Sequence, residues 1–186
     1  MPETFDLAAF ALELQKRTVA SIRILVFGEQ IDGFAKEIAA RSGLDVDAVY
    51  CLGLSGYVQE AYRLLLVEEI QQKKPAYVCA AHNSQGLEFA PAAAAAAGAA
   101  CITGVNGIVD GEGRLLFQKY AYGGKLQASM AAAADTTVLT IQPGVFKLAV
   151  KPPAAPGRID RRQAEARLKR TRPLGTRQAS MDTANI

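Results

Sequence analysis

The stretch from residue 76 to residue 105 constrains the fold more than any other part of the sequence. An apolar run, Ala76–Ala81, is followed by a polar loop, an alanine-rich tract that begins near Pro91, and a second apolar run, Ala99–Val105. Short continuous apolar runs bounded by turn residues are typical of strands buried on both faces. Proline is tolerated in the first turn of a helix, and glycine, here Gly98, favours its end. The stretch therefore predicts a strand–helix–strand unit whose first loop lies at the carboxyl edge of a parallel sheet.

The rest of the sequence alternates helical and strand-like patterns before it becomes rich in strands. Three further helices are predicted at residues 4–16, 30–41 and 57–72, with strands at 22–28 and 47–52. A hairpin turn is expected at Asp110-Gly111, a strand with a glycine interruption at 120–128, and a last strand at 136–141. This order predicts an α/β three-layer sandwich with a mostly parallel sheet and an antiparallel hairpin addition near the C-terminus. We expect a Rossmann-like topology, similar to that of adenine-nucleotide α-hydrolases.

Charge is distributed unevenly along the 186 residues. Residues 151–186 hold nine Lys and Arg against three Asp and Glu, whereas residues 1–150 hold twelve against fifteen. We therefore expect an α/β domain over 1–150 and a basic linker or tail over 151–186, in which residues 160–170 could form a short helix. The tail lacks interleaved aromatic residues, which favours a solvated or partner-binding arm over a nucleic-acid-binding one.

The sequence favours a cytoplasmic protein without membrane insertion. No run approaches the roughly 18 uncharged apolar residues of a transmembrane helix, and the acidic start lacks the basic region of a signal peptide. Cys51, Cys79 and Cys101 each lie in a strand-like run, and no CxxC pair is present. Buried free thiols are therefore expected rather than a metal or redox site.

Two polar, glycine-containing segments are candidate binding sites. The loop at residues 83–86 precedes a helix, where exposed N–H groups attract anions, but it could equally be a capping loop in which Gly86 supplies a positive φ. It matches neither a P-loop nor a dinucleotide fingerprint. Gly123-Gly124-Lys125 could be a bulge with a surface lysine or a nucleotide contact. Both alternatives stay open at both segments.

No acid–base constellation is evident. His82, the single histidine, stands alone at the end of a predicted strand, which favours a hydrogen-bonded structural role over a catalytic one. The carboxylates of Glu29, Asp32, Asp45 and Asp47 are expected to be solvated.

Three segments together resemble the N-terminal, non-flavin domain of the α subunit of electron-transfer flavoproteins. Asn83–Ala94 is similar to the family's loop T/S-x-G-R-D-L-A-P-R-L-A, Lys119–Lys125 to its R-P-x-Y-G-G-K/N strand, and Thr140–Phe146 to its T-x-R-P-G-x-F ending. Their order and spacing, over roughly residues 5–146, make the resemblance specific. Leu87 and Ala92 depart from it, because the family usually has arginines there.

The resemblance implies a domain that docks against a β subunit and helps to enclose a flavin. It implies FAD in the assembled complex rather than in this chain alone, AMP on the partner subunit as a second nucleotide, and a dehydrogenase as redox partner. The family's opening strand and its FAD-binding domain are expected to be absent, since the sequence starts on the helix that follows the former and ends at residues 181–186, which resemble the approach to the latter.

The resemblance also assigns residues to cofactor or subunit contacts. They are, in the order of expected importance, Lys119, Tyr122, Gly123, Gly124 and Lys125, then Asn83, Ser84, Gly86 and Glu88. The chain is expected to be an electron-carrier component rather than a catalyst by itself. The alternative hypothesis is a stand-alone small module that binds AMP or ATP.

Overall fold

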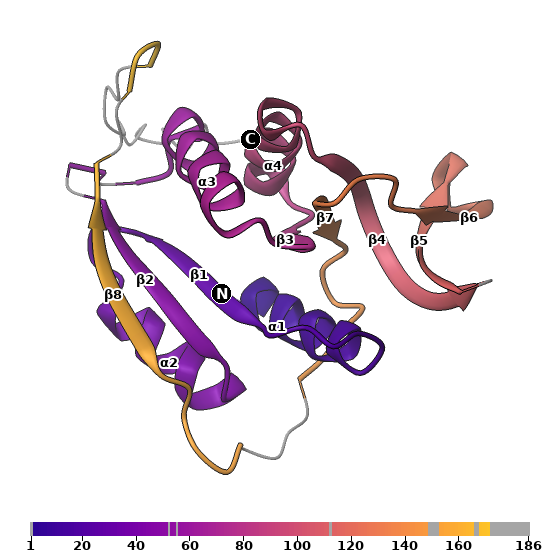
Figure 1. The fold of residues 1–186 in the computed structure, drawn as a ribbon, viewed down its shortest axis with the longest axis horizontal. Helices are drawn as coiled ribbons and strands as arrows, with labels where there is room; N and C mark the ends of the chain where they lie inside the picture. The colour runs from indigo at the N-terminus through magenta and orange to yellow at the C-terminus, as the bar shows by residue number, and fades with distance from the viewer. Residues whose placement is uncertain are drawn as a thin grey trace, which may run out of the picture.

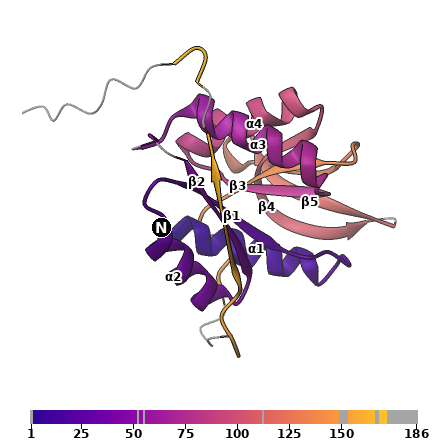
Figure 2. The same ribbon diagram turned by 60° about the vertical axis from the view of Figure 1, so that its left-hand side comes forward.

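The computed structural model describes residues 2–51, 53–54, 56–111, 113–148, 153–165 and 168–171. Its strands form a middle layer between two layers of helices (Figure 2). One face carries α1 (Pro2–Gln15) and α2 (Asp32–Ser42), and the other carries α3 (Gln59–Lys73) and α4 (Ser84–Ala97). The predicted three-layer α/β fold is therefore confirmed, and the helices expected at 4–16, 30–41 and 57–72 lie close to these positions. The fourth helix begins at Ser84, so Pro91 lies inside it and not in its first turn as expected.

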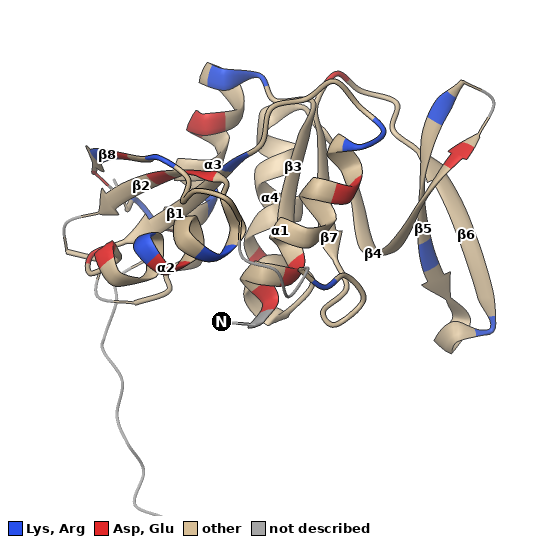
Figure 3. Ribbon diagram, turned by 90° about the horizontal axis from the view of Figure 1, so that it is seen from below, with Lys and Arg blue, Asp and Glu red and all other residues tan. Residues whose placement is uncertain are grey.

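The middle layer consists of two sheets. The three-stranded sheet contains, in spatial order, β1 (Arg23–Gly28), β2 (Asp45–Cys51) and β8 (Ile159–Ala164), all parallel. The five-stranded sheet contains, in spatial order, β3 (Tyr77–Ala81), β7 (Thr137–Ile141), β4 (Ala100–Gly111), β5 (Arg114–Ala121) and β6 (Leu126–Ala131). In this sheet β3, β7 and β4 are parallel, whereas β5 and β6 extend it in antiparallel fashion. Figures 1 and 3 show the two sheets side by side, with β1 facing β3.

Strand β7 lies inside the five-stranded sheet, where it pairs with β3 on one side and β4 on the other although it follows both in the sequence. All five of its residues are buried. A run of apolar and β-branched residues suits this position, because a central parallel strand is covered on both faces. The strand–helix–strand unit predicted from residues 76–105 is thus present as β3, α4 and β4, with β7 inserted between its strands.

Helix α3 packs against both sheets. Its Ala61 and Leu65 belong to a buried cluster with β2 of the three-stranded sheet, and its Leu66 and Ile70 belong to another with β3, α4 and β7. On the opposite face, α1 packs against the five-stranded sheet through Phe10 and α2 against the three-stranded sheet. The two sheets are therefore joined mainly through the helices above and below them.

Several local predictions are wrong. Residues 159–164 form β8 rather than part of a helix. The β4–β5 turn follows Gly111 instead of centring on Asp110-Gly111, since Gly111 still pairs with Arg114. Residues 120–128 do not form one strand, because the 3-10 turn η1 (Tyr122–Gly124) separates β5 from β6.

The cysteines differ in burial, which corrects the expectation of three buried thiols. Cys51 is buried and Cys79 is partly buried, but Cys101 is exposed. Burial raises the pKa of the Cys79 thiol to about 12. Among the described residues, no helix combines the length and apolar character that a membrane crossing requires. In the same part of the chain, no three His, Cys, Asp or Glu side chains converge as metal ligands would.

The last described residues bind the start of α3 through Glu60. The two Glu60 carboxylate oxygens accept hydrogen bonds from the backbone N–H groups of Lys169, Arg170 and Thr171 and from the Thr171 hydroxyl, at 2.8–3.1 Å. Led by the Thr171 hydroxyl, these donors lower the pKa of Glu60 to about 2. The rest of the predicted tail, from residue 172 onward, lies outside the described residues.

Candidate functional site

The loop between β3 and α4 is a capping loop. Asn83 is the N-cap of α4, and its side-chain oxygen accepts a hydrogen bond from the Gly86 N–H at 2.9 Å. Gly86 is not in the left-handed region, so the expected positive φ is wrong. Glycine is required there for another reason, because a Cβ would overlap the Ala81 carbonyl oxygen. The predicted site residues Ser84 and Glu88 are exposed on the first turns of this helix.

His82 lies at the end of β3 and contacts β7 and β4. Its Nδ1 is 2.8 Å from the hydroxyl oxygen of Thr140, which also accepts a hydrogen bond from the Gly104 N–H at 3.0 Å. Gly104 has φ +73°, and a Cβ there would lie 3.3 Å from the imidazole. Burial, assisted by the positive charge of Lys119, lowers the pKa of His82. His82 is therefore hydrogen-bonded, as expected, and held against the carboxyl edge of the five-stranded sheet.

Lys119 is the predicted site residue on β5, and its side chain reaches the carboxyl edge of the five-stranded sheet. Its Nζ donates a hydrogen bond to the Thr103 hydroxyl at 3.3 Å. Thr103 lies where the pairing of β4 with β7 shifts register between Ile102 and Val105. The irregularity in β4 thus brings Lys119 near His82, which sequence spacing alone could not indicate.

The β5–β6 arm, residues 114–131, projects beyond the helices that cover the rest of the sheet (Figures 1 and 3). Tyr122 at its tip has φ +52°, and Gly123 and Gly124 also have positive φ. The side chain of Tyr122 is 78% exposed and that of Leu126 is 57% exposed. A tyrosine in the left-handed region is uncommon, because this backbone conformation is unfavourable for a residue with a side chain. The turn therefore keeps an aromatic ring in solvent although its backbone conformation costs free energy.

Exposed apolar side chains on the arm continue the face of β5 that faces the core. Phe117 is fully buried, yet Met130, its partner on β6, is 40% exposed, and Leu126 pairs with Ala121 further along the same face. Tyr120, 61% exposed, lies on the opposite face. Met130 and Tyr120 were not among the predicted site residues. Met130 could have been recognised as an apolar residue directly opposite the core residue Phe117, but only if the pairing register of β5 and β6 had been known.

The predicted site residues form two separate groups. In the described part of the chain, no hydrogen bond or ion pair joins Tyr122, Gly123, Gly124 or Lys125 to the residues of the β3–α4 loop. Lys119 alone lies on the arm and also influences the carboxyl edge through His82.

The N-terminus of α4 carries no cation for the diphosphate of FAD. Helix α4 contains no Lys or Arg, and the Gly86 N–H in its first turn is already bound by Asn83. Leu87 and Ala92 add no charge where arginines would. A dinucleotide diphosphate needs free N–H donors or cations at such a terminus. Helix α4 therefore offers a diphosphate no cation and one N–H fewer than an uncapped helix would.

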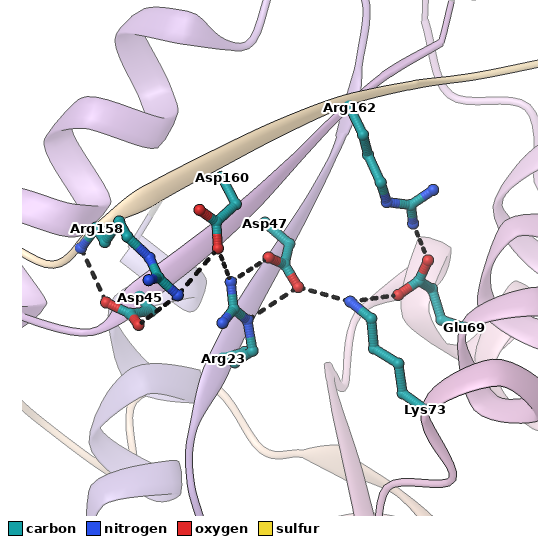
Figure 4. Close-up of polar contacts among 8 residues, drawn as sticks. All are labelled: Arg23, Asp45, Asp47, Glu69, Lys73, Arg158, Asp160 and Arg162. Atoms are coloured by element: carbon teal, nitrogen blue, oxygen red, sulfur yellow. Dashed lines mark hydrogen bonds and ion pairs between the residues drawn. The ribbon is translucent and has the colours of Figure 1, made fainter.

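A network of charges on the three-stranded sheet was missed by sequence reasoning (Figure 4). Asp47, expected to be solvated, is 8% exposed and accepts hydrogen bonds from Arg23 of β1 and Lys73 of α3. Lys73 also pairs with Glu69 at 3.0 Å, and Glu69 contacts Arg162 of β8. The network is completed by Asp45, Arg158 and Asp160. Four cations and four anions alternate in it, so the network has no net charge that would attract a charged ligand. Its role is to join β1, β2 and β8 to α3.

Comparison with known proteins gives a consistent result. The family model described as electron transfer flavoprotein domain matches residues 1–167. The electron transfer flavoprotein subunit alpha of Syntrophomonas wolfei is 27% identical over 145 residues, which cover 78% of this chain and 44% of that protein. The subunit alpha of Thermoanaerobacterium thermosaccharolyticum is 23% identical over 164 residues, 86% of this chain and 49% of that protein. The chain thus spans about half the length of these relatives. Because the family model matches most of its length, the chain belongs to the electron transfer flavoprotein family.

Proposed function

We propose that this chain is the partner-docking domain of an electron-transfer flavoprotein α subunit. In this role it takes part in flavin-mediated electron transfer together with a β subunit and a flavin-binding domain. Membership of the family and the two α-subunit relatives support the general assignment. The observation that carries the docking role is the exposed apolar face of the β5–β6 arm.

The arm has the features of a binding surface rather than of an ordinary sheet edge. Tyr122, Leu126 and Met130 present aromatic and apolar side chains to solvent where the sheet leaves its covering helices. Monomeric proteins rarely expose several large apolar side chains together without a partner. Tyrosine is also among the residues that contribute most to binding energy at interfaces. The free-energy cost of the left-handed conformation of Tyr122 would be offset if a partner buries the ring.

The cofactors belong to the assembled complex in this proposal. FAD is held by the flavin-binding domain, AMP by the partner subunit, and electrons arrive from a dehydrogenase. The part of this chain is to cover apolar surface and exclude water near the flavin, which requires no proton-transfer residue. Lys119 and Lys125 would meet acidic groups of a partner, while Asn83, Ser84, Gly86 and Glu88 would shape the neighbouring carboxyl edge together with Gly123 and Gly124.

The docking role is tested by co-expressing the chain with a β subunit and a flavin-binding domain. Tyr122→Ser and Leu126→Ser are each expected to weaken association at least tenfold, measured by calorimetry, because each removes a large contact side chain. Val19→Ser is the matched control, since Val19 is fully exposed in the loop before β1. Unchanged affinity in both arm variants would contradict the proposal.

Nucleotide titration tests the alternative. The isolated chain is expected to bind AMP, ATP and FAD more weakly than millimolar, because α4 carries no cation to bind the phosphates and its Gly86 N–H is already bound by Asn83. Micromolar binding of AMP or ATP by the isolated chain would instead identify a stand-alone nucleotide-binding module.

A further inference from the structure

A hollow of about 450 Å³ lies beside β8, the outer strand of the three-stranded sheet. Its lining comes from three elements: Asp32 at the start of α2, Tyr50 of β2, and Arg161, Arg162 and Gln163 of β8. Figure 1 shows β8 and the β5–β6 arm on opposite sides of the molecule. A ligand in this hollow would therefore not touch the docking surface proposed for the arm.

The carboxylate of Asp32 is held through one of its two oxygens. Its Oδ1 accepts a hydrogen bond from the Tyr50 hydroxyl at 2.7 Å and another from Nε of Arg161 at 3.3 Å. These donors, led by the Tyr50 hydroxyl, lower the pKa of Asp32, so the carboxylate is charged at neutral pH. Among the described residues, no hydrogen bond reaches Oδ2. The carboxylate thus has a fixed orientation and one oxygen that can accept hydrogen bonds from a ligand.

The guanidinium of Arg161 is also only partly used. Its Nε donates to Asp32, and within the described residues neither Nη atom forms a hydrogen bond or an ion pair. A guanidinium presents its donors as a planar fork that matches the two oxygens of a carboxylate. Gln163 lies two residues further along β8, on the same face of the strand, and adds a side-chain amide to the lining. This side of the hollow is therefore suited to an anion.

The hollow contains separated charges without an excess of either sign. Arg162, the third charged residue of the lining, pairs with Glu69 of α3. One cation and one anion, Arg161 and Asp32, remain to meet a ligand. A ligand with a single charge would be attracted by one of them and repelled by the other. A small ligand that carries both charges would satisfy both groups.

We propose that this hollow binds a free amino acid, whose carboxylate pairs with the Nη donors of Arg161 and whose ammonium group donates to Oδ2 of Asp32. Both contacts are charge-assisted hydrogen bonds, which are stronger than neutral ones. Tyr50 is a positioning residue, because its hydroxyl fixes the Asp32 carboxylate. No aliphatic side chain of the described residues lines the hollow, so it recognises the charged groups common to amino acids more than their side chains.

NMR titration of the full chain with L-alanine tests the proposal, with the backbone amide signals of Asp32, Tyr50 and Gln163 as reporters. Propionate and ethylammonium are the matched probes, because each keeps one of the two charged groups of L-alanine. L-alanine is expected to bind about tenfold more tightly than either probe, since each probe lacks one charge-assisted hydrogen bond.

Two substitutions separate the roles of the charged residues. Arg161→Gln is expected to remove the advantage of L-alanine over ethylammonium, and Asp32→Asn its advantage over propionate. A merely structural role of either residue would weaken all three probes alike. Arg158→Gln is the matched control and should change none of these affinities, because Arg158 pairs with Asp45 and Asp160 outside the lining of the hollow.

Three results would overturn the proposal. One is the absence of a saturable shift with L-alanine. Another is equal binding of propionate and L-alanine, which would make the hollow an anion site. The third is an unchanged preference for L-alanine in both Arg161→Gln and Asp32→Asn, which would place the ligand elsewhere on the chain. Association of the β5–β6 arm with a partner is measured separately, so either proposal can fail without the other.

Discussion

Two buried threonines on β7 differ in whether their hydroxyl groups are hydrogen-bonded, and this difference should affect stability. Thr140 is fully buried, and its hydroxyl serves both the Gly104 N–H and the His82 ring. Thr137 is 1% exposed, and its hydroxyl has no hydrogen-bond partner in the structure. A buried polar group that is unpaired costs free energy, whereas removing one that is paired leaves its partners unsatisfied.

Valine at these two positions is therefore expected to have opposite effects. Thr140→Val should lower the free energy of unfolding by about 1–3 kcal/mol, because it leaves two polar groups unpaired, and Thr137→Val should be neutral or stabilising by up to about 1 kcal/mol. Urea denaturation of both variants provides the measurement. Equal losses would show that the hydroxyl of Thr137 has a partner after all.

The charge of Lys119 should be detectable at His82. Burial is the larger cause of the lowered pKa of His82, and the charge of Lys119 is the second. Lys119→Met is expected to raise this pKa without restoring the ordinary value, while Lys125→Met, at the tip of the arm, leaves it unchanged. Because the protein contains a single histidine, proton NMR titration reads the pKa directly.

The same shift predicts a pH dependence of stability. A histidine whose pKa is lower in the folded state takes up its proton more readily when unfolded, so stability is lost as the pH falls through about 6.5 and below. This loss should be smaller in Lys119→Met than in the wild type. An unchanged pKa in Lys119→Met would mean that the lysine does not act on the histidine.

At the scale of elements, α4 depends on small side chains. Ala90, Ala93 and Ala94 are almost completely buried in a cluster with α3 and the strands of the five-stranded sheet. Alanine lets the helix approach its neighbours closely, and a larger side chain would force them apart. Ala96, one turn further along, is exposed and offers a control.

Overpacking this helix should therefore be costly only at its buried positions. Ala93→Leu is expected to reduce the free energy of unfolding by about 1–3 kcal/mol, whereas Ala96→Leu should change it by less than about 0.5 kcal/mol. Thermal and urea denaturation of the pair give the comparison. If both variants are as stable as the wild type, α4 is packed more loosely than the structure indicates.

Elements defined by local patterns were predictable, and elements defined by distant partners were not. The alternation of apolar runs and helical periods was enough to predict β1–α2–β2–α3–β3–α4–β4. Residues 159–164 have no apolar pattern, and they form β8 because β2 offers an edge and Asp45 offers its carboxylate to the Arg158 N–H. The Gly123-Gly124 pair indicates that strand pairing is interrupted, but a bulge and a turn would both produce such a pair. Only the pairing register of β6 with β5 shows that it is a turn.

The candidate site was predictable to the same extent. The capping loop around Asn83 follows from asparagine chemistry, whereas the turn around Tyr122 was expected only as an interruption of one strand. The approach of Lys119 to His82 depends on the irregularity in β4, and the burial of Asp47 depends on β8 and α3 arriving from remote parts of the chain. Neither could be derived from local sequence.

At the scale of the whole molecule, the charge network joins segments that are far apart in the sequence. Asp47 of β2 contacts Arg23 of β1 and Lys73 of α3, and the Arg23 guanidinium also reaches Asp160 of β8 (Figure 4). Burial opposes the charge of Asp47, but the hydrogen bonds from Arg23 and Lys73 outweigh it and lower the pKa of Asp47. The three-stranded sheet is thus held to α3 by charge as well as by apolar contact.

Neutralising Asp47 should weaken the whole three-stranded sheet. Asp47→Asn is expected to lower the free energy of unfolding by about 1–3 kcal/mol at pH 7, because two cations lose a buried partner. Asp45→Asn, at an exposed ion pair, should cost less than about 1 kcal/mol.

The lowered pKa of Asp47 also sets the sign of the pH effect. Its contribution to stability is present above its unfolded pKa of about 4 and disappears as the pH falls through the lower folded value, so the difference between the wild type and Asp47→Asn should shrink at acidic pH. Urea denaturation at pH 7 and pH 3 provides the measurement. A difference that stays constant between these pH values would mean that Asp47 acts through its shape and not its charge.

The capture of residues 169–171 by Glu60 has a mechanical consequence. Four donors hold this short segment against the first turn of α3, so the chain is anchored to that helix up to Thr171. A domain attached after this anchor would have its orientation relative to the two sheets set by one side chain, the carboxylate of Glu60.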